Sequence, residues 1–207
     1  IIKKYSIRDK RIKIFRNLER KGLVLSLNFL IPKTKGMYIA RMDADDISFS
    51  RRFEKQIEYL ENHKEIVACG GQELIIDQKG KVLAEKYFPT DPSVCYNSLM
   101  NFMVIQPPLL MARGEIFRIF RYDNHVFKND DITMHFKLLK MGGFGNVDQI
   151  IFKYRKHNDS LTHQNPKKVY FLALKARLNA ILNENYRPGI SNIILSLLET
   201  LVVILLP

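Results

Sequence analysis

The sequence predicts an α/β sandwich built on a mixed sheet, because helical and strand-like hydrophobic patterns alternate along its 207 residues. Helical spacing of apolar side chains marks three segments, residues 23–31, 51–62 and 132–141. Short apolar runs with the length of buried strands occur at residues 37–42, 66–71 and 149–154. With 46% hydrophobic residues the chain can bury a sizeable core, so one main domain is expected.

The first elements are a strand, a helix and a second strand. Residues 11–15 alternate polar and apolar side chains, which predicts a strand. The helix over residues 23–31 is closed by Pro32 and Gly36, where a proline and a glycine follow its last apolar residues. The run at residues 37–42 then has the length and composition of a buried strand.

A helix, a strand and a hairpin follow. Ser50 can cap a helix over residues 51–62. Its apolar side chains recur at helical spacing at Phe53, Ile57 and Leu60. The buried strand of residues 66–71 leads into a hairpin over residues 73–83, whose turn falls near residues 77–80. Farther on, Gly142 and Gly143 end the helix of residues 132–141 before the last strand.

Composition limits the classes of partner. The chain has 33 Lys and Arg against 21 Asp and Glu, so anionic partners such as nucleotides, polyphosphates, nucleic acid or an acidic lipid surface are favoured. Cys69 and Cys95 have neither metal-ligand spacing nor a disulfide framework, which favours a reducing cytoplasm. Gly-rich phosphate loops and nucleophile elbows are absent from the sequence, and no basic–aromatic nucleic-acid motif occurs, so no nucleic acid partner is expected.

Three carboxylates follow the strand of residues 37–42 directly: Asp43, Asp45 and Asp46. Open α/β sheets bind ligands beyond the carboxyl ends of their strands. Carboxylate oxygens are preferred by Mg²⁺ and Mn²⁺, which often share them with substrate phosphates. The alternative is a solvated loop that leads into the next helix.

A second acidic pair, Asp130 and Asp131, stands at the start of the helix near residues 132–141. Together with the first set it makes a metal-plus-base arrangement, in which one site neutralises phosphate charge and the other accepts a proton. Helix capping is the alternative for this pair. His157, beside Arg155 after the last strand, could ligate the metal or contact a leaving phosphate, or it is a surface residue.

Residues 35–48, followed by Arg52, Phe53 and Gln56, strongly resemble the bacterial family 2 glycosyltransferases of GT-A fold. Weaker matches follow in the same order at Tyr122-Asp123, Asp130-Asp131 with Leu138 and Gly142, and Tyr154-Arg155 with His157 and Ser160. The resemblance covers about residues 1–163. It implies a GT-A-like sandwich on a mixed, mainly parallel sheet.

The resemblance also implies a reaction: inverting transfer of a sugar from a nucleotide-diphosphate donor to a hydroxyl acceptor, in the biosynthesis of bacterial capsule, exopolysaccharide or lipopolysaccharide. Asp45 would be the principal ligand of Mg²⁺ or Mn²⁺, and Asp43 would contact the nucleotide ribose or the metal. Asp131 would be the catalytic base. The remaining substrate-binding residues would be Asp130, Arg155 and His157.

Two regions are expected: a GT-A core over residues 1–163 and C-terminal helices over residues 164–207. The chain does not begin with Met, and the Val-Ile-Ile-Pro-like strand and first βαβ part of the family are missing from it, which predicts an N-terminally incomplete chain. A basic helix followed by the apolar residues 190–206 suits peripheral docking on the inner face of the cell membrane, near a lipid-linked or oligosaccharide acceptor. That both helices simply pack on the domain is an equal alternative.

Two other functions remain open at this point. Asp43-x-Asp45 after an apolar strand also suits an aspartyl-phosphate phosphatase of the haloacid dehalogenase type, with Asp43 as the nucleophile. The Ser/Thr and Lys motifs of that class are not convincingly present, which ranks it second. The other alternative is a non-catalytic fragment that binds only membrane or a partner protein.

Overall fold

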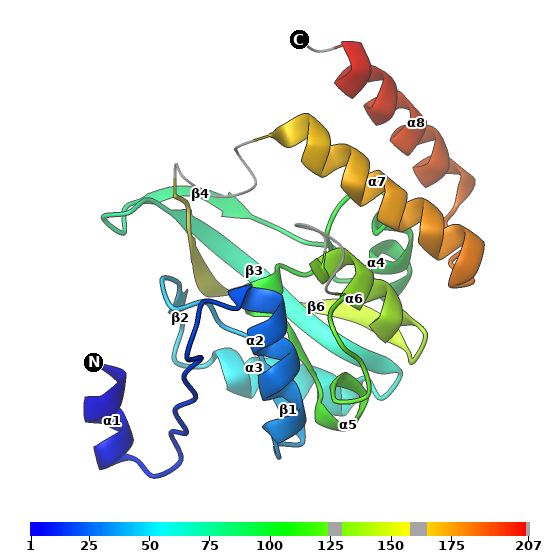
Figure 1. Ribbon diagram of the computed structural model, residues 1–207. Helices are drawn as coiled ribbons and strands as arrows, with labels where there is room; N and C mark the ends of the chain where they lie inside the picture. The colour runs from blue at the N-terminus through cyan, green and yellow to red at the C-terminus, as the bar shows by residue number, and fades with distance from the viewer. Residues whose placement is uncertain (124–129, 158–164, 206–207) are drawn as a thin grey trace.

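The computed structural model describes residues 1–123, 130–157 and 165–205, without the side chain of Asp130 (Figure 1). Its helices are α1 (Ile2–Arg8), α2 (Gly22–Leu30), α3 (Arg52–Asn62), α4 (Pro92–Ser98), α5 (Gly114–Phe117), α6 (Asp130–Leu139), α7 (Pro166–Asn183) and α8 (Ile190–Leu205). Its strands are β1 (Tyr38–Ala40), β2 (Ile47–Ser48), β3 (Ile66–Ile76), β4 (Val82–Lys86), β5 (Met111–Arg113) and β6 (Gly143–Arg155). Short 3₁₀ turns occupy Ile31–Lys33 and Pro107–Leu109.

In the described part of the chain the strands form one mixed sheet in the order β1-β5-β3-β6-β2, with β4 added beside β3. The pairing of β3 with β6 is parallel, whereas β1–β5, β5–β3, β3–β4 and β2–β6 are antiparallel. The mixed sheet is therefore confirmed, but its expected mainly parallel character is wrong for these pairs. The chain path explains one of these pairs, because β3 turns back directly as a hairpin into β4 and therefore pairs with it antiparallel.

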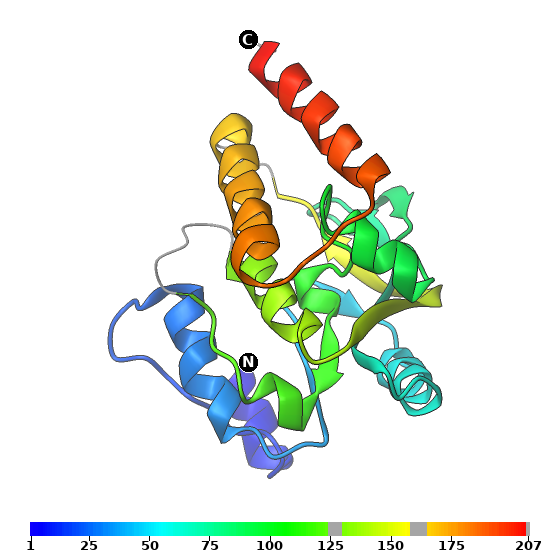
Figure 2. The same ribbon diagram turned by 90° about the vertical axis from the view of Figure 1, so that its right-hand side faces the viewer.

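Helices cover both faces of the sheet, which gives the expected sandwich (Figures 1 and 2). On one face α3 packs through Leu60 against Cys69 and Met111. On the other face the larger core joins Ala68, Ala112 and Phe144 to residues of α4, α6 and α7. Side chains alternate between the two faces along each strand, so neighbouring positions serve different cores.

Several expected elements are confirmed, and two details are wrong. The helix near residues 23–31 is α2, and the hairpin is β3–β4, in which Gly80 adopts φ +89° in the turn. Residues 11–15 form no strand and are exposed, because a strand also needs a neighbour with which to pair. Ser50 does not cap α3, whose cap residue is Arg51 and makes no side-chain capping bond.

The two C-terminal helices attach to the core in different ways. Helix α7 buries Ala173, Arg177 and Ala180 against the domain. Helix α8 instead turns a polar stripe inward, since Ser196 is buried and Tyr170 of α7 donates from its hydroxyl to the Ser196 carbonyl. The apolar side chains of α8 are left largely exposed: Ile194, Leu197, Leu198, Leu201 and Val202. None of the helices described is both long and apolar enough to span a membrane.

The candidate site lies at the edge of the sheet where the carboxyl ends of β1 and β6 are found. Strand β5 is antiparallel to both β1 and β3, and β6 is parallel to β3, so β1, β3 and β6 all run in the same direction. The carboxyl ends of β1 and β6 therefore lead out at this edge, where open α/β sheets hold their ligands. The chain then continues into Asp43 after β1 and into His157 after β6.

Candidate active site

Arg41 joins the two acidic segments that the sequence singles out. Its guanidinium is buried, forms an ion pair with the Asp131 carboxylate through Nη1, and places Nη2 3.9 Å from Oδ1 of Asp43. Nη1 also donates to the Tyr122 hydroxyl at 3.0 Å. Burial opposes the charge of Arg41, but Asp131, Tyr122 and Asp43 together raise its pKa above the ordinary value. Strand β1 and the first turn of α6 thus meet at one cation.

Asp43 lies in this cluster as a half-buried carboxylate. Burial raises its pKa, as do Asp45 and Asp131, while the Arg41 charge opposes the rise. Asp43, Arg41 and Asp131 together line a cavity of about 580 Å³, whose wall also includes Lys86, Tyr154 and His157. The cavity therefore brings cationic, anionic and aromatic side chains into contact with one space large enough for a small polar ligand.

Asp45 lies on the outer side of the acidic loop. Its Oδ2 is 2.7 Å from Nε2 of His157, so the loop after β1 and the loop after β6 meet at this pair. The backbone carbonyl of Asp45 accepts a bond from Nε of Arg155 at 2.7 Å. Nη1 of Arg155 donates to the carbonyls of Asp77 and Gln78, which ties the acidic loop to the β3–β4 hairpin.

Asp46 points into the protein. Its Oδ1 accepts the backbone N–H of Arg155 at 2.7 Å, and Oδ2 is buried without a hydrogen-bond partner among the described residues. Burial raises the pKa of Asp46 to about 6, with further upward effects from Asp45 and Asp43. The side chain thus holds the loop against β6, whereas Asp43 and Asp45 remain partly exposed.

Two buried polar residues of α3 form hydrogen bonds with the backbone of segments that line the site. Arg52 donates through Nη2 to the carbonyls of Arg41 at 2.8 Å and Pro108 at 3.1 Å, and through Nε to Gln56. Gln56 in turn donates to the Leu109 carbonyl at 2.8 Å. The sequence pattern assigned the inner face of α3 to Phe53, Ile57 and Leu60, but Phe53 is 51% exposed while Arg52 and Gln56 are fully buried. Apolar periodicity misses this face because it carries hydrogen-bonding side chains.

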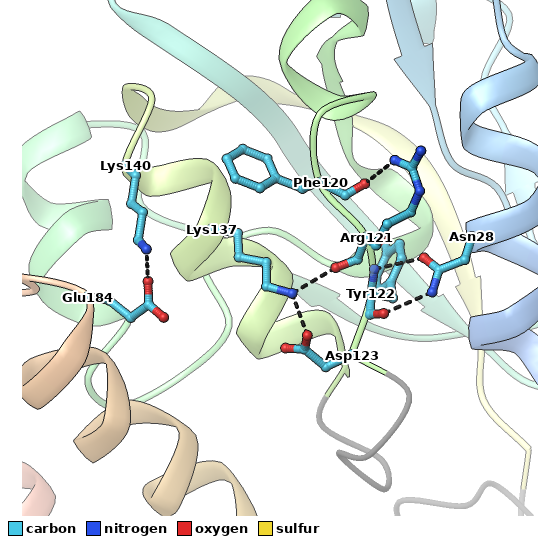
Figure 3. Close-up of polar contacts among 8 residues, drawn as sticks. All are labelled: Asn28, Phe120, Arg121, Tyr122, Asp123, Lys137, Lys140 and Glu184. Carbon is cyan, nitrogen blue, oxygen red and sulfur yellow. Dashed lines mark hydrogen bonds and ion pairs between the residues drawn. The ribbon is translucent and has the colours of Figure 1, made fainter.

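The Asp131 end of the site is held by α2 and α6. Asn28 of α2 accepts the backbone N–H of Tyr122 and donates to its carbonyl, both at 2.8 Å (Figure 3). Nearby, Lys137 of α6 pairs with Asp123 and donates to the Arg121 carbonyl (Figure 3). One helical turn after Asp131 in α6, Nδ1 of the buried His135 donates to the Asp131 carbonyl at 2.7 Å. Burial lowers the pKa of that imidazole.

The structure brings together most of the site residues that the sequence indicates, and Arg41 connects them. Asp43, Asp45, Asp131, Arg155 and His157 all lie around this edge of the sheet. Asp130 is the first residue of α6, and its side chain lies outside the described part, as does Ser160. Arg41 was not singled out, although a lone arginine within an otherwise apolar strand was the available signal.

The carboxylates suit a divalent cation that is shared with a ligand. Within residues 1–123, 130–157 and 165–205, no group of three or more His, Cys, Asp or Glu side chains is placed to hold a metal ion. Mg²⁺ sites at phosphates, however, often use one or two carboxylates and complete their coordination with phosphate oxygens and water. Asp43 and Asp45 are both partly exposed carboxylates at one strand end and fit that kind of site.

Comparison with known proteins identifies the family. The model of glycosyl transferase family 2 matches residues 1–104, half of the chain, and the chain belongs to this family. It is 29% identical to the uncharacterized glycosyltransferase MJ1057 of Methanocaldococcus jannaschii, over 76% of this chain and 55% of that protein. It is 30% identical to the O-antigen biosynthesis glycosyltransferase WbnJ of Escherichia coli, over 77% of this chain and 63% of that protein. The chain thus spans a little over half the length of these relatives.

Solved structures confirm the GT-A fold. TarS 1–349 of S. aureus, in complex with UDP-GlcNAc, matches 85% of this chain and 51% of that chain with a TM-score of 0.54 at 13% identity. The mannosyltransferase PcManGT of Pyrobaculum calidifontis, in complex with GDP-Man and Mn²⁺, matches 98% of this chain and 66% of that chain with a TM-score of 0.53 at 12% identity. This fold agrees with the family that the sequence comparison identifies.

Proposed function

We propose that this chain carries the metal and base residues of an inverting glycosyltransferase, which moves a sugar from a nucleotide-diphosphate donor to a hydroxyl acceptor during the synthesis of a bacterial surface polysaccharide. The observation that supports this most strongly is the meeting of Asp43 and Asp131 at Arg41 in one cavity. A transferase needs a donor-side acidic group and a base within reach of one substrate pair, and these two residues come from distant parts of the sequence.

Asp131 is the proposed general base. As the acceptor oxygen attacks the anomeric carbon, its proton passes to the Asp131 carboxylate. The new bond forms on the side opposite the departing group, so the configuration at that carbon inverts. The bond from the anomeric carbon to the diphosphate breaks, and its electron pair leaves with the nucleoside diphosphate. Asp130, beside the base, is proposed to lie near the donor or acceptor sugar.

Asp45 and Asp43 are the proposed ligands for Mg²⁺ or Mn²⁺, with Asp43 also directed toward the nucleotide ribose. A bound cation would neutralise charge on the diphosphate. His157, which contacts Asp45, is proposed to orient that carboxylate and to contact the phosphate. Arg155 is proposed to act on substrate through the acidic loop, because its guanidinium already binds the Asp45, Asp77 and Gln78 carbonyls.

The similar proteins support the donor and the pathway class. TarS and PcManGT were solved with UDP-GlcNAc and with GDP-Man and Mn²⁺, which supports a nucleotide-sugar donor and a divalent cation here. WbnJ is named for O-antigen biosynthesis, which supports a surface polysaccharide or its lipid-linked or oligosaccharide precursor as the acceptor.

We also propose that α8 contacts the inner face of the cell membrane. Its exposed side chains include Ile194, Leu197, Leu201 and Val202, and its polar stripe is turned toward the domain. Lys167, Lys168 and Lys175 of α7 add positive charge near this helix, which suits an anionic lipid surface. Contact there would bring the cavity close to a lipid-linked acceptor.

A panel of UDP- and GDP-sugars with Mn²⁺ tests the proposed function. Donor hydrolysis or transfer is expected for the wild type and should be lost in both Asp45→Ala and Asp131→Asn. Equal activity in the wild type and both variants would refute the assigned roles. Release of inorganic phosphate from phosphomonoesters, abolished by Asp43→Asn, would instead support the phosphatase alternative.

A further inference from the structure

The position of Arg41 assigns it a part that the family resemblance does not. Arg41 is 7% exposed and follows the last residue of β1, where its guanidinium faces two carboxylates. A buried cation is costly unless it is paired and hydrogen-bonded. Arg41 satisfies this condition through groups of the candidate site itself: the Asp131 carboxylate, the Tyr122 hydroxyl and the more distant Asp43 carboxylate.

The contacts divide the guanidinium between the two halves of the site. Nη1 binds Oδ1 of Asp131 and the Tyr122 hydroxyl, whereas Nη2 faces Asp43 at 3.9 Å. The centre of the guanidinium also lies 5.6 Å from the centre of the Tyr122 ring, within the range of a cation–π contact. A planar fork of donors can make these contacts together, whereas a lysine ammonium presents a single charged centre.

Both ends of Arg41 are anchored. Arg52 of α3 holds the Arg41 carbonyl at 2.8 Å, which fixes the backbone from which the side chain extends. At the other end, the side chain of Asn28 of α2 forms two hydrogen bonds with the backbone of Tyr122 (Figure 3). The Tyr122 hydroxyl in turn accepts a hydrogen bond from Nη1 of Arg41. The backbone of Arg41 is therefore held from α3, and its guanidinium is held from α2 through Tyr122. Such fixing of a side chain is the preorganisation that catalytic groups require.

We propose that Arg41 is the positioning residue for the base: it holds Asp131 by Oδ1 at the cavity wall, so that Oδ2 takes the acceptor proton, and it fixes the base relative to the donor-side Asp43. This inference rests on the proposed transfer reaction. Misplacing a reacting group by about 1 Å can cost on the order of 100-fold in rate. Loss of the guanidinium should therefore lower kcat much more than it raises KM for the donor.

Two pairs of variants separate positioning from stability. Arg177→Met is the control for Arg41→Met. Arg177 of α7 is also buried, but its guanidinium donates to the backbone carbonyl of Leu99 and not to a residue of the candidate site. Tyr186→Phe is the control for Tyr122→Phe, because the hydroxyl of Tyr186 donates to the backbone carbonyl of Tyr96. All four changes are expected to lower the melting temperature. Only Arg41→Met and Tyr122→Phe should lower kcat, by about 100-fold for the first and less for the second.

Arg41→Lys gives a graded test. The ammonium restores the charge without the fork, so kcat should recover in part and stay below that of the wild type. If Arg41→Met and Arg177→Met lose kcat equally, or if Arg41→Met changes only KM, the positioning role is refuted.

Crystal structures of the wild type and of Arg41→Met provide a readout that needs no activity. The Asp131 carboxylate is expected to leave its place at the cavity wall in the variant. An unchanged Asp131 position would overturn the inference. If the wild type transfers sugar from no donor, the proposed function fails, and this structural comparison still decides whether Arg41 positions Asp131.

Discussion

Replacing Arg52 tests how α3 supports the site, and its neighbour provides a matched control. Arg52→Met removes a buried guanidinium that donates to the carbonyls of Arg41 and Pro108 and to the Gln56 side chain. Arg51→Met removes an exposed guanidinium that pairs with Glu54 on the helix surface. The two substitutions are chemically identical and adjacent, so they differ only in what the side chain contacts.

The magnitude follows from the groups that Arg52→Met leaves behind. Two backbone carbonyls lose a charged donor, and each buried unsatisfied group costs about 1–3 kcal/mol. The guanidinium also lies 4.9 Å from the centre of the Phe152 ring, and this contact is lost. Burial lowers the pKa of Arg52 to about 10, so the protein bears a desolvation cost that the variant is spared. A net loss of about 2–4 kcal/mol in the free energy of unfolding is expected.

Thermal unfolding measures this difference. For a chain of this size, a change of about 3 kcal/mol corresponds to a melting temperature lowered by about 6–12 °C. Arg51→Met should melt close to the wild type, because exposed ion pairs add little stability. Equal melting temperatures for Arg51→Met and Arg52→Met would refute the view that α3 supports the site through its polar face.

Three further predictions concern metal, pH and membrane. Asp45→Ala should abolish Mn²⁺ binding in isothermal titration while leaving the melting temperature near that of the wild type, and undiminished binding would exclude Asp45 as the main ligand. Glu73 of β3 is fully buried, and burial raises the pKa of its carboxyl to about 7. The folded protein therefore binds this proton more tightly than the unfolded chain does. The stability that the protonated carboxyl contributes is full below about pH 4 and is lost as the pH rises through 7. Glu73→Gln should therefore flatten the fall in unfolding free energy between pH 5 and pH 8, and an unchanged slope would contradict this. Replacing Leu197 and Leu201 of α8 together by Asn should weaken sedimentation with vesicles of anionic lipid, whereas replacing the exposed Leu83 of β4 by Asn should not; equal binding would remove α8 as the contact.

The sequence predicted those parts of the fold in which hydrophobic pattern and packing agree. Strand β1, strand β3 and its hairpin follow from apolar runs and turn residues, and α2 follows from helical spacing. The inner face of α3 could not be predicted, because Arg52 and Gln56 are buried by hydrogen bonds to backbone carbonyls, and no hydrophobic pattern reports such bonds.

The sequence predicted that two acidic segments act together in one site, but not the residue that connects them. That they meet depends on tertiary structure, since β1 and α6 are far apart in the sequence and touch through Arg41. The orientation of α8 also depends on tertiary structure and could not be predicted from the sequence. Its spacing identified an apolar face, but the hydrogen bonds of Ser196 and Asn192 turn the opposite, polar side toward the domain.

The most direct test of the account is the rate of sugar transfer by Asp131→Asn beside the control Asp148→Asn. Asp148 is an exposed aspartate of β6 that lies outside the cavity lining. With Mn²⁺, a nucleotide sugar and its acceptor, Asp131→Asn should lower kcat by about 10²–10⁴-fold, the usual contribution of a general base, and Asp148→Asn should leave it near the wild-type value. Wild-type turnover in Asp131→Asn would contradict the central claim that this carboxylate takes the acceptor proton.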